Sequence, residues 1–583
     1  MRRGDRNVVV MALAGALVIT ACEGSLLGSA AGPSGAPGSS GSGSGSGPGG
    51  GVMGPAVCES DSLLVGSAPM RRLANAEYLH TLRDLFPGVT VALPELPPDT
   101  DTGGFENDAL SLGASDVRVA RWEEIAWRYG SAITATPASL STFLPCAASA
   151  TDETTEQACG QELVRDFGLR AMRRPLASDE RDRYLALFEA QRVAIDFEGA
   201  VQLTVMAMLQ APSFLYRIEV PSVDSQSGAR DAAIAALDSY QVATRLSYFL
   251  WESTPDDALL DAAGAGELET PEQIEAQARR MLEDGRAREA VVDFHRQWLD
   301  FDRILEEEHA RRVPELFPGW NEDLRNAVRE EQDRFVESTI FDDEGTLTAL
   351  LTSNRTWVNG ELAQLYGVAG PSDGSTWTQT ELPAAERAGL LTRAGFLASH
   401  SHSANGSPPL RGVFITERLL CEPRPSPPAS ANTSPPTAEP GAGPRTNRQL
   451  FEERTAAPVC QGCHVRMDGM GFGFENYDAI GAFRELDDGL PVDSSGNVLG
   501  TDVDGPYVGG VELSGILAES ERVQECATRQ WVRYALGRAP EREDACLIDR
   551  LADRFAESDG NVRDLLVAIV TSPEFRHRPA AQE

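Results

Sequence analysis

The chain has 583 residues, of which 42% are hydrophobic, so it is long enough for several domains with real cores. It carries 51 Lys and Arg against 88 Asp and Glu, a net charge of −37. Such a charge repels nucleic acid and anionic lipid surfaces, so we exclude nucleic-acid binding and expect a solvated acidic surface.

The N-terminus has the pattern of a bacterial export signal. Three arginines within the first six residues precede an apolar run over 8–21, which is too short to span a membrane. The run ends in Ile-Thr-Ala-Cys at 19–22, which resembles the lipobox of bacterial lipoproteins. The resemblance implies a signal peptide over 1–21, lipidation of Cys22 and, because Glu23 follows, the outer membrane of a Gram-negative bacterium. A simple secreted protein is the alternative.

Residues 22–57 consist mostly of Gly, Ser, Ala and Pro and cannot bury a core. About thirty such residues behave as a flexible tether whose root-mean-square reach is on the order of 30 Å. No later apolar run has the length of a membrane span. We therefore expect an extracytoplasmic protein whose lipid is its only membrane attachment.

The rest of the chain is predicted to be mainly α, with several helical domains in series and long loops. Composition and helical periodicity divide it into 58–150, 151–225, 226–370, 371–490 and 491–583. A helix is predicted at 75–86 with Asn75 as its N-cap, and another at 237–250 with Asp238 as its N-cap.

Further elements follow from caps and patterning. Thr-Pro pairs at 254–255 and 270–271 each place a capping residue before a proline at the first helical position. A heavily charged helix at about 320–340 is expected at the surface. Residues 495–511 are expected to hold a short hairpin, and 509–575 a small helical bundle.

The most informative segment is Cys460-Gln461-Gly462-Cys463-His464, which a Pro-rich loop over 422–446 precedes. Two thiols three residues apart followed by an imidazole form the attachment pattern of a c-type haem. On one helical turn both sulfurs can add to the two vinyl groups, while His464 supplies a nitrogen to the iron. The alternatives are a disulfide or redox pair, a zinc site and a chance match. No thioredoxin-like pattern and no second pair at zinc-finger spacing accompanies the segment.

Spacing also indicates residues that would surround such a haem. Glycines alternate with Met and Phe over 467–474, so this backbone is expected to approach a flat macrocycle closely. Met470 is one candidate for the second axial ligand. His402, or His400 two residues earlier, is another, and the two imidazoles are alternatively a separate metal site or a solvated polar loop. Open five-coordinate iron is the third alternative, and Arg411 is a candidate partner of a haem propionate.

Besides Cys22 and the haem pair, six cysteines remain: Cys58, Cys146, Cys159, Cys421, Cys526 and Cys546. An even number in an exported chain indicates disulfides, and six thiols allow 15 connectivities. Short separations favour Cys146 with Cys159 and Cys526 with Cys546. Cys58 with Cys421 then follows by elimination.

Several stretches of the chain carry a family resemblance: RRLANAEYLHTLRDLF, RAMRRPLASDE, MLQAPSFLYR, ATRLSYFLWESTPDDALL, RRMLEDGRA, GLLTRAGFLASHSHSANGSPPLRG, CQGCHVRMDGMGFGFENYDAIGAFR, RYALGR and LLVAIVTSPEF. They resemble a family of exported bacterial proteins with a planctomycete-type cytochrome c motif, assembled from domains of unknown function 1587, 1595, 1592, 1588 and 1585. The resemblance implies export, mostly helical structure and one covalent haem on Cys460, Cys463 and His464. It also places His402 and Arg411 in a recurrent segment, and it implies no substrate.

These observations lead to three hypotheses of function. In the first, a lipid-anchored extracytoplasmic protein carries one haem c and exchanges single electrons with a redox partner protein. In the second, it is an oxidoreductase that acts on a small-molecule substrate at an open distal face, with His402 assisting. In the third, Cys460 and Cys463 form a disulfide in a structural or binding lipoprotein. Whether the protein is an enzyme is left open.

Overall fold

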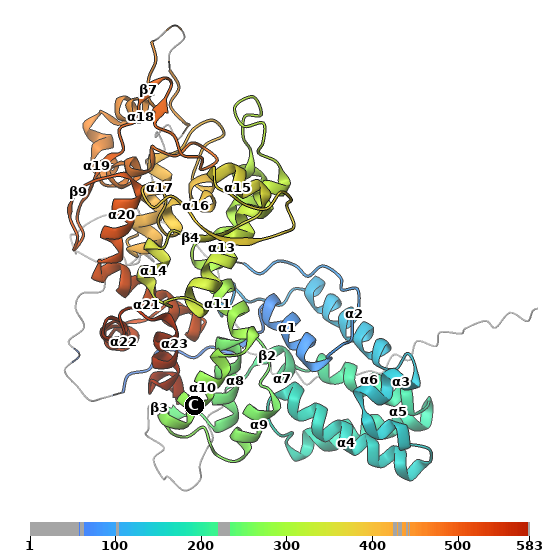
Figure 1. Cartoon of the computed structure of the whole chain (residues 1–583). Coiled ribbons are helices and arrows are strands. Elements are labelled where there is room, and N and C mark those ends of the chain that lie inside the picture. Colours follow the sequence, from blue (N-terminus) through green and yellow to red (C-terminus); the bar gives the residue numbers. More distant parts are fainter. Residues whose placement is uncertain are drawn as a thin grey trace, which may run out of the picture. The chain divides into compact units, whose positions relative to one another are not determined.

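The computed structural model describes Cys58 and residues 63–100, 104–219, 234–423, 428, 434–438, 441 and 443–580. The predicted signal peptide, Cys22 and the tether lie outside the described residues, as does much of the Pro-rich loop. Helices make up most of the described chain, and its strands form two-stranded antiparallel pairs (Figure 1). The predicted mainly α class is confirmed.

The helices follow one another in three groups. The first group is α1 (Asn75–Leu85), α2 (Asp116–Ile133), α3 (Pro137–Phe143), α4 (Glu153–Met172), α5 (Ser178–Ala194), α6 (Phe197–Leu209) and α7 (Pro212–Leu215). The second is α8 (Ser239–Leu250), α9 (Asp257–Gly264), α10 (Pro271–Leu282), α11 (Gly285–Trp298), α12 (Glu307–Ala310), α13 (Glu322–Phe341), α14 (Leu347–Thr352) and α15 (Gly360–Tyr366). The third is α16 (Ala394–Ser399), α17 (Pro408–Phe414), α18 (Asn447–Thr455), α19 (Pro458–Gly471), α20 (Gly509–Ala518), α21 (Glu521–Leu536), α22 (Ala545–Glu557) and α23 (Val562–Thr571).

Short elements connect these helices. The strand pairs are β1 (Arg71–Arg72) with β2 (Tyr216–Arg217), β3 (Ile234–Ala236) with β10 (His577–Pro579), β4 (Arg355–Val358) with β5 (Thr378–Glu381), β6 (Leu486–Asp487) with β7 (Leu490–Pro491), and β8 (Ser495–Val498) with β9 (Gly505–Val508). The single turns of tighter or wider helix are η1 (Pro145–Ser149), η2 (Phe301–Leu305), η3 (Leu390–Thr392), η4 (Ile415–Leu419), η5 (Phe472–Phe474), η6 (Arg542–Asp544) and η7 (Glu574–Arg576). The pair β8 and β9 confirms the predicted hairpin.

Helices α1 to α7 enclose a hydrophobic core of their own. Leu82, Ile125 and Val205, from α1, α2 and α6, are completely buried in it. Each helix buries one face because its apolar residues recur every three or four positions. The disulfide Cys146–Cys159 joins η1 to α4, as predicted.

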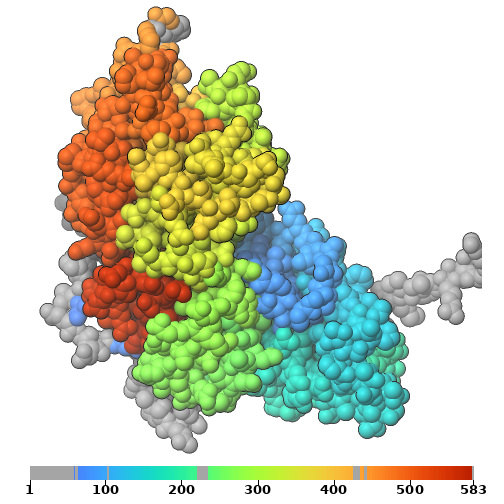
Figure 2. All heavy atoms as spheres, viewed as in Figure 1, coloured from blue at the N-terminus to red at the C-terminus, as the bar shows by residue number. Residues whose placement is uncertain are grey.

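The second and third helix groups share one continuous core. The rings of Phe294 on α11 and Trp531 on α21 stack with their centroids 3.4 Å apart, and α10 packs against α23. Figure 2 shows the red C-terminal residues directly beside the green residues of the second group. The predicted bundle at 509–575 therefore forms as α20 to α23, but it does not have a separate core.

The other two disulfides join segments far apart in the sequence. Cys58 is bonded to Cys546, and Cys421 to Cys526. The predicted pairs Cys526–Cys546 and Cys58–Cys421 are wrong. A short separation in the sequence favours a disulfide only where the entropy of closing the loop in the unfolded chain decides the pairing. Here the packing of the folded chain decides, because Cys526 lies on the buried face of α21 against η4, and Cys421 comes two residues after the end of η4.

The charged helix predicted at about 320–340 forms as α13, but it is not a surface helix. Glu331 in its middle is completely buried. Its carboxylate accepts hydrogen bonds from Tyr366 Oη at 2.6 Å and Thr356 Oγ1 at 2.7 Å, and it pairs with Arg393 Nη1 at 3.3 Å. These partners replace water around the charge, so a glutamate in this pattern does not mark a solvated face.

Two of the predicted helix caps form as expected. The Asp238 side chain accepts from the backbone N–H of Gln241 at the start of α8. The Thr270 side chain accepts from the backbone N–H of Gln273 at the start of α10, with Pro271 at the first helical position.

The other two predicted caps are wrong. Helix α1 is preceded by Ala74, whose backbone N–H donates to the buried Glu77 carboxylate, while the Asn75 side chain donates to Pro97 O. Helix α9 is capped by Asp256, two residues after Thr254. In both places an acidic side chain satisfies the free N–H groups of the first turn.

None of the helices in the described ranges is both long and apolar enough to cross a membrane.

The disulfides predict a difference in stability. Cys421–Cys526 closes a loop of 105 residues and Cys146–Cys159 one of 13. The Cys421→Ser, Cys526→Ser double variant should lose about 4.7 kcal/mol of unfolding free energy, and the Cys146→Ser, Cys159→Ser variant about 3 kcal/mol, because the longer crosslink restricts the unfolded chain more. Urea unfolding of both variants measures the difference. Peptide mapping without reduction checks the pairing, and a peptide joining Cys526 to Cys546 would contradict it.

Candidate functional site

The two cysteines of the motif lie one helical turn apart on the first half of α19. Pro458 opens this helix, and the structure leaves both thiols unpaired, with Cys463 exposed and Cys460 half-buried. The neighbouring Val459 side chain is 81% exposed. Positions three and four apart share one side of a helix, so Cys460, Cys463 and His464 face a common side with this uncovered apolar residue. The arrangement suits two bonds to one planar group.

His464 is held by a buried carboxylate one turn later. Its Nδ1 lies 3.0 and 3.1 Å from the two carboxylate oxygens of Asp468, which also accepts a hydrogen bond of 3.5 Å from Thr455 Oγ1 on α18. Nδ1–H donates, so Nε2 is left with a lone pair. Pairs of this kind fix the tautomer and the ring orientation of metal-bound histidines. Asp468 was not predicted as a site residue, although its place four residues after His464 on a helix is a usable signal.

The pKa values of this pair follow from the same contact. The hydrogen bond that His464 donates to Asp468 raises the pKa of His464 above its ordinary value, although burial lowers it in part. Burial raises the pKa of the Asp468 carboxyl, and the hydrogen bond from His464 lowers it only in part. The imidazole and the carboxylate therefore bind a shared proton more strongly than either group does in water.

The second half of α19 is fixed against α17 by glycine contacts. A Cβ atom added to Gly412 would lie 1.8 Å from Met467 O, and one added to Gly471 would lie 1.9 Å from Pro408 O. Only glycine permits this approach of two backbones. Gly471 thus serves the contact between the helices, while Gly469 and Gly473 lie against Asn497 of β8 and Tyr507 of β9. The glycines of 467–474 therefore pack against protein, and the expectation that this backbone approaches a macrocycle is not supported. Tyr507 Oη adds bonds of 2.8 and 2.7 Å to two carbonyls of α19.

Met470 lies in the hydrophobic core and is completely buried. It follows His464 by six residues on the same helix, so it points roughly 120° away around the axis. A ligand opposite His464 has to come from another element. The geometry does not support Met470 as the second axial ligand.

His402 lies beside α18, the helix that also contacts Asp468. Its ring is within 11° of parallel to the ring of Phe451, with centroids 6.5 Å apart. Burial and the charges of Arg312 and Arg411 lower the pKa of His402, so the imidazole is neutral near pH 7, as a metal ligand must be. His402 remains a candidate for the distal side.

His400 is in a different environment from His402. It is buried between the rings of Phe396 and Phe414, and its Nδ1–H donates to Phe396 O at 2.9 Å. Burial lowers the pKa of His400 to about 3. The two histidines do not combine into a metal site, and across the described ranges no group of three or more His, Cys, Asp and Glu residues is placed to hold a metal ion.

Arg411 is completely buried under the candidate site. Its guanidinium donates to Phe474 O at 2.8 Å, Ser401 Oγ at 3.0 Å and Leu397 O at 3.2 Å. These bonds join α16, α17 and η5. A contact with a haem propionate would need a donor that reaches the surface, so this arrangement does not support the predicted role of Arg411.

The residues of the first half of α19 fit a c-type haem. The two thiols are unpaired and on one side of a helix, and His464 presents Nε2 next to them. The alternative of a Cys460–Cys463 disulfide is not present in the structure. Asp468 would orient His464, which would bind the iron. The geometry does not identify a second iron ligand among the described side chains.

Five family models match the chain in series, each described as a protein of unknown function. They are DUF1587 over residues 71–151, DUF1595 over 159–219, DUF1592 over 237–368, DUF1588 over 387–487 and DUF1585 over 500–575. The candidate site lies inside the DUF1588 match, and the order is the one that the sequence resemblance implies. No curated protein and no solved structure matches the chain.

The Asp468–His464 contact predicts a pH-dependent stability in protein without haem, made with Cys460→Ser and Cys463→Ser. The folded-state pKa of His464 is raised, so its stabilisation is fully present below the unfolded pKa of about 6.5 and is lost as pH rises through the folded pKa. The parent should be more stable than its Asp468→Asn variant. This difference in unfolding free energy should be about 1 kcal/mol larger at pH 6 than at pH 9.

Urea unfolding at the two pH values measures this gain. The matched control is Asp166→Asn, which removes an exposed carboxylate that is paired with Arg165 instead of a histidine. This control should show no such difference. An equal effect of Asp468→Asn at both pH values would contradict the prediction.

Proposed function

The chain belongs to the planctomycete cytochrome c-type family that carries these five domains in series, and we propose that it is an exported c-type haem protein that transfers single electrons. The observation that carries the proposal is the pair of unpaired cysteines on α19. The six other described cysteines all form disulfides, whereas Cys460 and Cys463 stay apart next to an oriented imidazole. Each thiol would add its S–H across one vinyl group, which needs no oxidant.

The residues of α19 divide the work of holding the group. Cys460 and Cys463 would hold it covalently, and His464 would bind the iron through Nε2 while Asp468 fixes the ring. When bound, the haem supplies one-electron redox chemistry at its iron. The glycine contacts with α17 keep the helix in place. Because the first half of α19 is exposed, electrons could pass directly to a redox partner protein or a small molecule.

The disulfides support the proposed location outside the cytoplasm. Three disulfides form and persist in an oxidising compartment. Together with the export signal in the sequence, they favour the periplasmic side of a bacterial envelope. We propose attachment to the outer membrane through lipidated Cys22, with 22–57 as the tether.

A second function is favoured by the burial of Met470. If Met470 does not bind the iron, His402 is the remaining candidate for the second ligand. An iron without a second protein ligand would leave room for a small substrate. In that case the protein is an oxidoreductase.

The primary proposal predicts covalent haem. Protein exported together with the haem-attachment machinery should give a c-type pyridine haemochrome spectrum. The Cys460→Ala, Cys463→Ala variant should lose it completely, because both thioether bonds are removed. Gln461→Ala, which changes an exposed residue of the same turn, is the matched control and should keep it. Absence of covalent haem from the unaltered protein would overturn both redox functions.

The distal side is tested by His402→Ala. If His402 binds the iron, the parent is low-spin and the variant becomes high-spin and binds carbon monoxide, with the haem still attached. Absorption and electron paramagnetic resonance spectra measure the change. His309→Ala, which removes another partly exposed histidine on α12, should leave the spectra unchanged. An unchanged low-spin spectrum in His402→Ala rules out this ligand, and a high-spin parent favours the oxidoreductase.

A further inference from the structure

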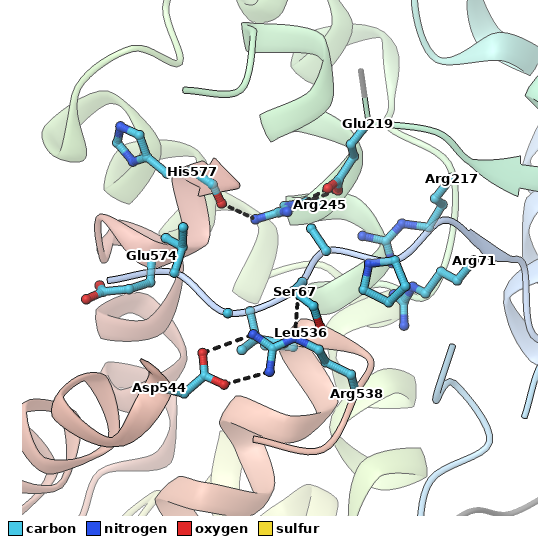
Figure 3. Close-up of a pocket in the computed structure, with 15 residues that line it drawn as sticks. Ser67, Arg71, Arg217, Glu219, Arg245, Leu536, Arg538, Asp544, Glu574 and His577 are labelled. Atoms are coloured by element: carbon cyan, nitrogen blue, oxygen red, sulfur yellow. Dashed lines mark hydrogen bonds and ion pairs between the residues drawn. The ribbon is translucent and has the colours of Figure 1, made fainter. Parts of the chain in front are cut away.

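A pocket of about 40 Å³ lies away from the motif, between the segment 65–69, strands β1 and β2, helix α8 and the C-terminal end of α21. Four arginines line it, namely Arg71, Arg217, Arg245 and Arg538 (Figure 3). Such a concentration of buried positive charge needs compensation by negative charge.

Two of these arginines are fully compensated. Arg245 binds both carboxylate oxygens of Glu219 at 2.6 and 2.7 Å, and Arg538 binds both oxygens of Asp544 at 2.6 and 3.0 Å. The acids of the wall are each paired: Glu219 with Arg245, Asp544 with Arg538, and Glu574 with Arg550. None of these carboxylates therefore pairs with the guanidinium groups of Arg71 and Arg217.

Arg71 and Arg217 share one carboxylate. They face each other in the β1–β2 register, and both approach Oε1 of Glu77, Arg71 at 3.4 Å and Arg217 at 3.6 Å. Arg71 also donates to Asn107 O at 2.8 Å. Arg217 is different: its side chain is 6% exposed, and its buried Nε and Nη1 have no hydrogen-bond partner in the described part of the chain.

The surroundings of Arg217 add positive charge. Its guanidinium carbon lies 5.2 Å from the ring centroid of Tyr248, and that of Arg173 lies 5.6 Å from the same centroid. The hydrogen bonds of Arg173 go to backbone carbonyls and the Tyr248 hydroxyl. Arg71 and Arg217 thus approach Glu77 directly, and the charge of Arg173 also stabilises the carboxylate form of Glu77. Asp99, the other carboxylate that acts on Glu77, is paired with Arg72 and Arg118. A buried charge without a partner is costly, and an anion would remove that cost.

The backbone at the end of α21 leaves space for the Arg71 side chain. Gly537, the C-cap of α21, has φ +62°, and a Cβ atom there would lie 1.9 Å from Nη1 of Arg71. Figure 3 shows the guanidinium group of Arg217 turned towards the interior of the pocket. The donors are thus positioned before any ligand arrives, which lowers the entropy cost of binding.

We propose that this pocket binds a small anion through a phosphate or carboxylate group, with Arg217 and Arg71 as the binding residues. The planar fork of a guanidinium matches two oxygens of either group. Arg217 supplies Nε and Nη1, neither of which is hydrogen-bonded, and Arg71 supplies the second charge. The overall charge of −37 disfavours anions at long range, so binding depends on this local geometry.

The test is isothermal titration calorimetry of the full-length protein with inorganic phosphate and, separately, with succinate, at constant ionic strength. Saturable binding of one anion per chain is expected for at least one of the two probes, and the pair distinguishes a phosphate from a carboxylate ligand. Arg217→Gln should weaken it at least tenfold. Arg183→Gln is the matched control, because Arg183 is an exposed arginine on α5 with a side chain that is 71% exposed. No saturable binding, or equal binding to Arg217→Gln, overturns the proposal.

Loss of Arg217 could also unfold the protein, so a second variant and a second measurement are needed. Arg217→Lys keeps the charge but loses the fork, and it should bind more weakly than the parent and more tightly than Arg217→Gln. Crystals of the unaltered protein soaked in arsenate should show anomalous density beside Arg217. Arsenate bound only elsewhere overturns the proposal. Neither measurement depends on haem, so the result is separate from the function proposed above.

Discussion

The backbone contact between α17 and α19 is the constraint on which the candidate site depends. Gly412 and Gly471 let the two helices approach until any side chain at either position would overlap a carbonyl oxygen. This contact buries the second half of α19 and leaves the first half in solvent. His464 lies at the boundary between the halves, close enough to the buried part for Asp468 to hold its ring. A covalently attached group would therefore sit on a rigid helix while remaining accessible.

The rest of the chain stabilises that helix pair from a distance. The Cys421–Cys526 disulfide joins the segment after η4 to α21, and α21 belongs to the core that the second and third helix groups share. Arg411 holds α16, α17 and η5 together with bonds to carbonyl oxygens and the Ser401 hydroxyl. A buried arginine that is bonded in this way satisfies several backbone carbonyl groups at once. This explains why a protein of this size surrounds a short motif: the site is held by contacts from many segments.

Local patterns in the sequence predicted the features that depend on interactions between neighbouring residues. The helical turn carrying Cys460 and Cys463, the caps at Asp238 and Thr270, and the β8–β9 hairpin depend on neighbours within a few residues. Long-range pairings were not predictable in this way. Cys546 bonds a cysteine 488 residues away, and nothing in its local sequence indicates that partner.

Burial of polar residues was the other limit of sequence reasoning. Periodicity reads charged residues as exposed, yet α13 buries Glu331 because Arg393, Thr356 and Tyr366 come from other segments. Arg411 was predicted to meet a propionate because it lies near the two histidines in the sequence. The sequence does not show that its guanidinium is completely buried and bonded to carbonyl oxygens.

One helix connects the surroundings of the two candidate sites. Cys526 on α21 is bonded next to η4, and Gly537 at its end packs against Arg71 in the anion pocket. The helical rise between these two residues is about 16 Å, twice the screening length of about 8 Å at physiological ionic strength. The field of a bound anion that passes through solvent is therefore weak at Cys526. A helix fixed by a disulfide near one end and a buried guanidinium at the other is stiff, so an anion that altered the redox site would have to displace α21 as a unit.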